Sequence, residues 1–351
     1  MESSRREIRA GILTYLACTF ALSSIFYTLI IRAGHLAAGH GLYVLGLMWC
    51  PGTAAIVTCL IRRRPLASLG WKWKWRYQAA AYLIPILYAG AAYGVVWATG
   101  LGGFPNPAVL DSFSKIGHTH VSTTRALIVF VLATGTLGMI SSTVSALGEE
   151  IGWRGFLVPE LAKTTSFTKT ALISGAIWTA WHVPILVFAD YNSGTPVWYG
   201  LTCFAVMVMG ISFVFAWMRL KSGSLWTGAF LHASHNLFIQ AILTPLTIDT
   251  GKTKWVIDEF GFALAIAAVV VAIIVWGLRA QVERDPINLG AADAPFAGHI
   301  DPLDPHPAGL RATALISLPR SGSIRETEAG CLLAFPISTP RRSRTPGVAR
   351  R

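Results

Sequence analysis

The chain has 351 residues, of which 53% are hydrophobic and only 13% are charged, and its formal net charge is +12. Because about a quarter of the residues of a typical soluble domain are charged, this balance argues against a soluble protein and indicates a membrane protein. The basic residues lie in short clusters between apolar runs or near the C-terminus, which is not the continuous basic face of a nucleic-acid-binding protein.

Long apolar runs follow one another through most of the chain. A helix that crosses a membrane needs about 20 mainly apolar residues. Eight stretches meet this requirement: 10–32, 41–61, 77–99, 124–149, 168–189, 197–218, 223–244 and 259–279. The first continues through Ile31 without a clear cleavage site, so it is interpreted as a retained helix and not as a signal peptide. We therefore predict an all-α integral membrane protein, a bundle of about eight transmembrane helices.

The short loops between these runs differ in their positive charge. Basic residues are frequent before the first run and after the second, fourth, sixth and eighth, and they are scarcer in the alternate loops. Because positively charged loops stay in the cytoplasm, this alternation predicts both termini in the cytoplasm. The expected location is the cell (plasma) membrane, crossed many times.

The character of the chain changes near residue 285. From there to residue 351 it is polar, rich in Pro and Arg, and without periodic apolar faces, so we predict a disordered tail. Four regions result: N-terminal helices and loops at 1–123, a central region at 124–245, a final transmembrane helix within 246–284, and the disordered basic tail at 285–351.

The central region carries the polar residues that are costly in hydrocarbon, and such residues are functional candidates. They form three groups: Glu149 and Glu150 with Arg154, Trp178 with His182, and His232 with Asn236. Residues four apart share a helix face, which pairs Arg154 with Glu150 and places His232 beside Asn236. Glu149 points about 100° away from Glu150 and is expected to face the bundle interior. His235 lies three residues after His232 and partly on the same side of the helix, so spacing alone does not exclude it as a site residue.

Each group also has a purely structural interpretation. The two glutamates could close a helix at the membrane surface, although acids are unfavourable at a helix C-terminus. We therefore expect the helix to continue past them toward Glu160. A single histidine or asparagine within a span often serves only as a hydrogen bond between helices. Three such groups on neighbouring helices are harder to explain in this way.

The three groups together resemble a known family. EExxxR (Glu149, Glu150, Arg154), an aromatic-xxx-His (Trp178, His182) and HxxxN (His232, Asn236) occur in the order of the three motifs of the CAAX-protease and bacteriocin-processing-enzyme family. This family (CPBP) is also called the Abi or type II CAAX prenyl endopeptidase family. The similarity covers about residues 124–245, which would then be the catalytic core. The sequence departs from the pattern at Trp178, where the family commonly has Phe.

The resemblance implies an intramembrane protease, a hydrolase that uses a glutamate. Carried over by position, Glu149 would be the general base that activates a water, and His182 would help to hold and polarise it. His232 and Asn236 would stabilise the oxyanion, while Glu150, Arg154 and Trp178 would support the site. Burial disfavours the charged carboxylate and so makes it a better base, and donors fixed on one helix face can be preorganised for the oxyanion.

The residues leave the question of a metal cofactor open. Glu149, His182 and His232 suit zinc, but there is no HExxH sequence and Asn236 is a poor zinc ligand. We predict a site without a metal or other cofactor. The expected partners are a protein or peptide substrate in or at the membrane and the lipid bilayer, with no nucleic acid.

Two other functions are compatible with the same sequence. A transporter would also have many helices and buried polar groups, but no pair of broken, repeat-related helices is visible. A non-proteolytic scaffold or immunity protein of the same fold is the second alternative. All motif positions are filled, which favours an active enzyme.

Overall fold

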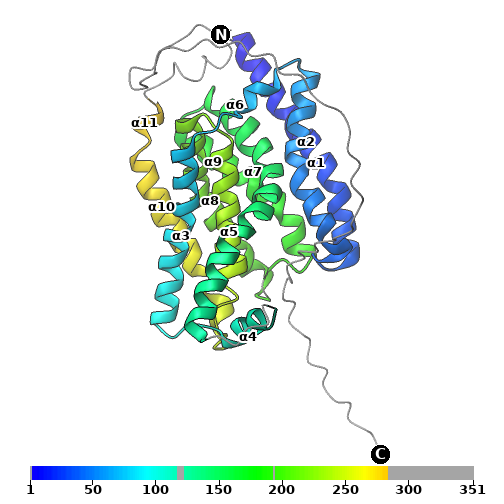
Figure 1. The fold of residues 1–351 in the computed structure, drawn as a ribbon. Coiled ribbons are helices and arrows are strands. Elements are labelled where there is room, and N and C mark those ends of the chain that lie inside the picture. The colour runs from blue at the N-terminus through cyan, green and yellow to red at the C-terminus, as the bar shows by residue number, and fades with distance from the viewer. Residues whose placement is uncertain (1, 117–121, 193, 284–351) are drawn as a thin grey trace, which may run out of the picture. The chain divides into compact units, whose positions relative to one another are not determined.

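The computed structural model describes residues 2–116, 122–192 and 194–283, and these residues form an all-helical bundle (Figure 1). The predicted disordered tail lies outside the described residues. The α-helices are α1 (Glu2–Ala33), α2 (Leu42–Ile61), α3 (Trp75–Ala98), α4 (Pro107–Ile116), α5 (Thr123–Glu150), α6 (Val158–Ala162), α7 (Phe167–Phe188), α8 (Val197–Ser222), α9 (Trp226–Asn236), α10 (Phe262–Gly277) and α11 (Ala280–Glu283). Two π-helices, η3 (Ile151–Leu157) and η4 (Leu237–Leu243), and three short 3₁₀ helices, η1 (Ala38–Gly41), η2 (Leu66–Leu69) and η5 (Thr253–Trp255), complete the described secondary structure.

The helices agree with the predicted all-α fold, and every predicted span contains one. Six of them are long and apolar enough to cross a membrane, while α10 is an apolar helix of only 16 residues. The predicted span 223–244 also lacks a helix that meets the length and hydropathy of a membrane span. Its α-helix, α9, has 11 residues and continues as η4. Here the polar residues of the third motif interrupt the apolar run, so the number of clear spans is lower than the predicted eight.

The helix that carries the two glutamates does not end at them. It runs from α5 through η3 into α6 as one continuous apolar helix, Thr123–Ala162, of 40 residues. The prediction that the helix continues toward Glu160 is therefore confirmed. Continuation provides the backbone of Glu149 and Glu150 with helical hydrogen bonds on both sides, so neither carboxylate lies at a helix end.

Glycines allow α2 to cross directly over this helix at the two glutamates. A Cβ atom added to Gly148 would lie 2.8 Å from the Met48 carbonyl oxygen, and one added to Gly152 would lie 2.6 Å from the Pro51 carbonyl oxygen. Any larger residue at either position would force the helices apart. Small residues permit this kind of close helix approach inside membranes, where van der Waals packing drives association.

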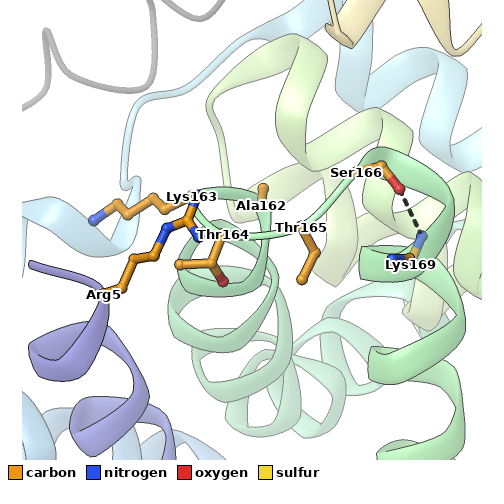
Figure 2. Close-up of a pocket in the computed structure, with 7 residues that line it drawn as sticks. All are labelled: Arg5, Ala162, Lys163, Thr164, Thr165, Ser166 and Lys169. Carbon is orange, nitrogen blue, oxygen red and sulfur yellow. Dashed lines mark hydrogen bonds between the residues drawn. The ribbon is translucent and has the colours of Figure 1, made fainter. Parts of the chain in front are cut away.

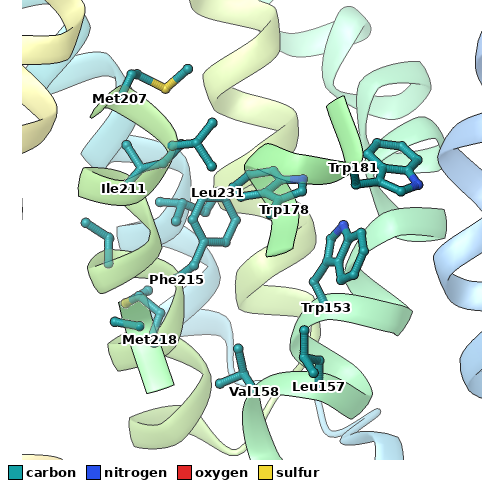
Figure 3. Close-up of a cluster of buried hydrophobic side chains, with 14 of the residues drawn as sticks. Trp153, Leu157, Val158, Trp178, Trp181, Met207, Ile211, Phe215, Met218 and Leu231 are labelled. Atoms are coloured by element: carbon teal, nitrogen blue, oxygen red, sulfur yellow. The ribbon is translucent and has the colours of Figure 1, made fainter. Parts of the chain in front are cut away.

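Many of the helices contribute to the core that surrounds the site. Helix α9 packs against α3 and α5, while α8 packs against α7 and α10. Between them lies a cluster of large buried side chains (Figure 3), among them Trp153 of η3, Trp178 and Trp181 of α7, Phe215 of α8 and Leu231 of α9. The motif-bearing segments are thus held against one another by aromatic packing.

The outward surface of the bundle is apolar. Large hydrophobic side chains are mostly exposed on several of the long helices, including Leu87 of α3 at 70% and Ile140 of α5 at 69%. A soluble protein would not display so many, whereas lipid covers them at no cost. The finding supports a multi-pass membrane protein. The start of α1, α6 and α11 lie at one end of the bundle and α4 lies at the other (Figure 1).

Candidate active site

Glu149 is buried near the point where α5 passes into η3. Its Oε2 atom accepts hydrogen bonds from the indole nitrogens of Trp153, at 3.1 Å, and Trp178, at 2.8 Å. Trp153 follows Glu149 by four residues on the same helix, whereas Trp178 comes from α7. Its other oxygen, Oε1, makes no hydrogen bond to any residue within the described part of the chain. One oxygen therefore anchors the carboxylate, and the other is left for a ligand.

Glu150 is fully buried, and one of its oxygens is paired with other groups, whereas Oε2 has no hydrogen bond within the described residues. Its Oε1 atom accepts from Nη1 of Arg154 at 2.7 Å and from Nδ1 of His232 at 3.0 Å. The Arg154 guanidinium lies over the Phe215 ring at 3.7 Å and over the Trp178 ring at 4.2 Å. The predicted pairing of Glu150 with Arg154 is present, and the structure adds His232 to it. Such contacts are needed because a buried charge is costly unless it is paired.

His182 lies on α7 one turn after Trp178. Its Nδ1 atom is 2.9 Å from the carbonyl oxygen of Trp178. Because a carbonyl oxygen only accepts hydrogen bonds, Nδ1 is the donor, and the Nε2 atom of a neutral ring carries the lone pair. Nε2 makes no hydrogen bond to any described residue, and the ring packs beside Trp181 and Phe204.

His232 and Asn236 lie one turn apart at the C-terminal end of α9. His232 uses Nδ1 to contact Glu150, and its Nε2 has no hydrogen bond within the described residues. The Asn236 side chain is half-buried and likewise makes no hydrogen bond to a described residue. In all four predicted catalytic residues, at least one polar atom is thus left for a water molecule or a substrate.

Trp178 is the residue at which the three motifs meet. Its indole donates to Glu149 of the first motif, and its ring lies 6.0 Å from His182 and 5.3 Å from His232. The same ring covers the Arg154 guanidinium. Asn236 follows His232 on the same helix face. A phenylalanine at this position would keep the ring contacts but could not donate the hydrogen bond to Glu149, so this departure from the family pattern adds a contact.

The first and third motifs share an unusual backbone feature. Glu149 and Glu150 stand immediately before the π-helix η3, and Asn236 stands immediately before the π-helix η4. The wider π turn is rare, occurs mostly as a single turn inside an α-helix, and is frequent at functional sites. The pattern of apolar residues gives no sign of it, so sequence periodicity could not have predicted either segment.

Gly228 allows α9 to approach the buried ion pair. A Cβ atom at this position would lie 2.5 Å from Oε2 of Glu150 and 3.2 Å from Cβ of Arg154. We expect Gly228→Ala to push α9 outward and to destabilise the protein by about 1–3 kcal/mol, as overpacking of a tight core does. Thermal unfolding in detergent measures this effect. Gly90→Ala on α3, where a Cβ would meet nothing within 4 Å, is the matched control and should be neutral or slightly stabilising. Equal melting temperatures for both variants would contradict the expectation.

A second buried polar network lies beside the site, and sequence reasoning missed most of it. The partners of His235 lie outside the three motifs: its Nδ1 contacts the Tyr88 hydroxyl and its Nε2 is 3.1 Å from Oε1 of Glu259. Oε2 of Glu259 accepts from the Tyr191 hydroxyl at 2.6 Å and from Gln240 at 3.1 Å. The Tyr191 ring stacks on His182 at 6.5 Å. Glu259 lies at the edge of the predicted span 259–279, and this position was the only feature of the sequence that could have marked it as a buried polar residue.

The Glu259 carboxylate makes stability depend on pH. Burial alone would raise its pKa, but hydrogen bonds from His235 and Tyr191 outweigh burial and keep the pKa below the ordinary value of 4.5. A carboxyl group whose pKa is lower in the folded state contributes stability above its unfolded pKa, and this contribution is lost as the pH falls through the folded value. We expect the melting temperature to fall below about pH 4.5 and this fall to be smaller in Glu259→Gln, which lacks the group.

The control for this experiment is Glu283→Gln, which changes an exposed carboxyl group in α11. This variant should keep the acid sensitivity of the unmodified protein, because an exposed carboxyl group has nearly the same surroundings folded and unfolded. A steep fall that persists in Glu259→Gln would show that other carboxyl groups carry the effect.

The acids and histidines of the three motifs can be compared with the requirements of a zinc site. Among the described residues, no group of three or more His, Cys, Asp or Glu side chains is arranged so that it could hold a metal ion. One oxygen of Glu149 accepts from two indoles, and the Nδ1 atoms of His232 and His182 face Glu150 and a backbone carbonyl. Zinc sites need three or four ligands converging at about 2.0–2.3 Å.

Two comparisons with known proteins agree with the motifs. The profile of the family described as type II CAAX prenyl endopeptidase Rce1-like matches residues 126–238. CAAX prenyl protease 2 of Methanococcus maripaludis is 30% identical over 136 residues, which cover 36% of this chain and 46% of that protein. The chain thus spans about half the length of this curated relative.

The matched region begins in α5 and ends in η4, so it contains all three motifs and the residues that surround Trp178. The match and the geometry concern the same segment of the chain. Residues 126–238 thus match the family of Rce1-like type II CAAX prenyl endopeptidases, and over this region the chain is similar to a curated CAAX prenyl protease.

Proposed function

We propose that this protein is a membrane endopeptidase that hydrolyses a peptide bond in a membrane-associated protein or peptide. One observation carries the proposal: Glu149, His182, His232 and Asn236 each leave a polar atom unbonded within the described structure, although most of their surroundings are apolar and packed. Groups left without partners at such a place are expected to bind a polar ligand.

In the proposed reaction, Glu149 is the general base. Its free Oε1 removes a proton from a water molecule, whose oxygen attacks the carbonyl carbon of the scissile peptide bond. The two indole N–H groups on Oε2 hold the carboxylate in place during this step. The proton then passes to the nitrogen of the leaving amine as the carbon–nitrogen bond breaks, which returns Glu149 to its charged form.

The two histidines and Asn236 complete the proposed site. With its Nδ1 proton held by the Trp178 carbonyl, His182 offers the lone pair of Nε2 to a hydrogen of the attacking water. The carboxamide of Asn236 donates to the oxyanion that forms on the substrate. His232 can donate from Nε2 when its ring carries both protons, since Nδ1 faces Glu150.

The substrate class follows from the location of the site and from the relative. The relative is named a CAAX prenyl protease, so a prenylated CAAX peptide is the first substrate to test. Within the protein, the site residues lie on helices embedded in an apolar bundle, which favours a substrate that is itself associated with the membrane. We propose a membrane peptide or membrane protein as the broader class.

Comparative peptidomics tests the proposed function. Membranes from cells that produce the unmodified protein are compared with membranes from cells that produce Glu149→Gln at an equal level. New peptide termini that depend on Glu149 would support an endopeptidase. Identical peptide sets, together with no cleavage of a prenylated CAAX peptide by the purified protein, would contradict it and leave a non-proteolytic role.

We further propose that hydrolysis needs no metal ion, which the absence of an HExxH sequence and the presence of Asn236, a poor zinc ligand, support. Purified enzyme should therefore keep its full rate after treatment with a strong chelator, and elemental analysis should find no stoichiometric zinc. Loss of activity on chelation and its return with zinc would contradict this expectation.

For the orientation, we propose that both termini lie in the cytoplasm and that the protein resides in the cell membrane. The positive charge of the loops supports this, because Arg-rich and Lys-rich loops stay on the cytoplasmic side. Labelling of single cysteines introduced into the loops, with a reagent that does not cross membranes, would test it.

A further inference from the structure

A polar cavity lies at the end of the bundle where α1 begins and α6 is joined to α7 (Figure 2). Its volume is about 370 Å³. The Arg5 side chain extends from α1 toward the segment between α6 and α7 (Figure 2). The polar lining consists of three cationic side chains and three hydroxyl side chains: Arg5, Lys163, Lys169, Thr164, Thr165 and Ser166.

The lining carries positive charge that the surrounding protein does not balance. No acidic residue lines the cavity. Lys163 lies 2.8 Å from Glu160, but this one carboxylate is shared with Arg64, also at 2.8 Å. Arg5 and Lys169 have no ion pair with any described residue. Like charges held around one cavity repel each other, so a bound anion would stabilise them.

An apolar groove of about 510 Å³ reaches the same turn of α7. Thr168 of α7 lines the groove, while its neighbours Ser166 and Lys169 line the polar cavity. Trp276 of α10 donates to the Thr168 hydroxyl at 3.1 Å, which places this tryptophan at the junction. The rest of the groove is hydrophobic and is formed by α8 and α10, with Val206, Met209, Phe213 and Ile273.

We propose that this pair of cavities binds an anionic phospholipid, with the phosphate headgroup in the polar cavity and an acyl chain in the groove. The cationic cavity lies at the ends of membrane-spanning helices, where lipid headgroups are found, and basic pockets between such helices bind anionic headgroups. A soluble anion would bind in the polar cavity but would make no favourable contact with the apolar groove.

A lipid bound at this position is expected to stabilise the folded protein. The segment between α6 and α7 connects the helix that carries Glu149 with the helix that carries His182. A headgroup bound to Lys169 and to Arg5 would tie this connection to α1. Because a ligand that binds only the folded state stabilises it, the melting temperature should rise with the concentration of the lipid. This site is separate from the proposed catalytic residues, and its test does not require activity.

The experiment uses the full-length protein in a neutral detergent and follows its melting temperature during titration with dioctanoyl phosphatidylglycerol. Dioctanoyl phosphatidylcholine and inorganic phosphate are titrated in parallel. We expect only phosphatidylglycerol to raise the melting temperature strongly. In Arg5→Gln/Lys169→Gln the apparent affinity should fall about 25-fold, since each basic residue near a membrane surface contributes about 1 kcal/mol, or about fivefold.

Two further variants make the test specific. Lys72→Gln/Lys74→Gln removes two exposed cations from the segment before α3, outside the cavity, and should bind the lipid as the unmodified protein does. Ala205→Phe places a ring in the groove without changing charge and should also weaken binding. Equal losses in the two double variants, or an equal response to inorganic phosphate and phosphatidylglycerol, would overturn the proposal. An unchanged affinity in Ala205→Phe would overturn the assignment of the acyl chain.

Discussion

Glu149→Gln is expected to reduce peptide-bond hydrolysis about 10²–10⁴-fold, the usual contribution of a general base. Glutamine has the shape of glutamate, and its carboxamide oxygen can still accept the hydrogen bonds from Trp153 and Trp178. Its amide nitrogen would then take the place of the free Oε1 atom. Since an amide cannot remove a proton from water, the site should remain folded and lose its base.

The measurement is the initial rate of cleavage of a Glu149-dependent substrate, combined with thermal unfolding of both proteins. The melting temperature should change little, because both indole contacts are retained. Activity within a few-fold of the unmodified enzyme would exclude Glu149 as the base. A large loss of stability would mean that the charge of Glu149 serves the fold.

Glu150→Gln is expected to lower the stability of the folded protein more than it affects the chemistry directly. Glu150 balances the Arg154 guanidinium, which is buried to 2% exposure. Removal of one member of a buried ion pair leaves an uncompensated charge and costs about 3–5 kcal/mol. The variant should therefore show a much lower melting temperature and poor yield. It also loses the charged partner of His232, so the activity of any folded fraction should fall as well.

Glu160→Gln is the matched control for this variant. Glu160 is also a buried carboxylate with two cationic partners, but Arg64 and Lys163 keep 25% and 33% of their side-chain surface exposed. Since those cations can return to water, the loss should be about 0–1 kcal/mol. Equal destabilisation of the two variants would contradict the assigned role of Glu150. If Glu149→Gln and Glu150→Gln proved identical in stability and activity, the proposed division of roles would be wrong.

The sequence by itself determined the features that follow from local geometry. Apolar runs of spanning length predicted the helices, because each helix satisfies its own backbone hydrogen bonds whatever lies beside it. The 3.6-residue helical repeat predicted the pairing of Glu150 with Arg154 and placed Glu149 on a different face. The unfavourable position of acids at a helix end predicted that the helix continues beyond them, as it does to Ala162.

Contacts between distant segments were decided only by the tertiary structure. Glu149 meets Trp178 at a separation of 29 residues and Glu150 meets His232 at a separation of 82. The spacing of the motifs does not encode these pairs, since they depend on where α7 and α9 cross α5. Those crossings are set by side-chain volume, with glycines such as Gly228 admitting the close approach.

The partners of His235 and Glu259 were likewise decided only by the tertiary structure. His235 could have faced the motif residues by its spacing, but the packing of α9 against α3 and the segment before α10 gives it Tyr88 and Glu259 as partners. Helical spacing fixes which residues share a face. Which neighbour covers that face is decided by the packing of the whole bundle, because a buried polar group is stable only where a partner from another segment reaches it.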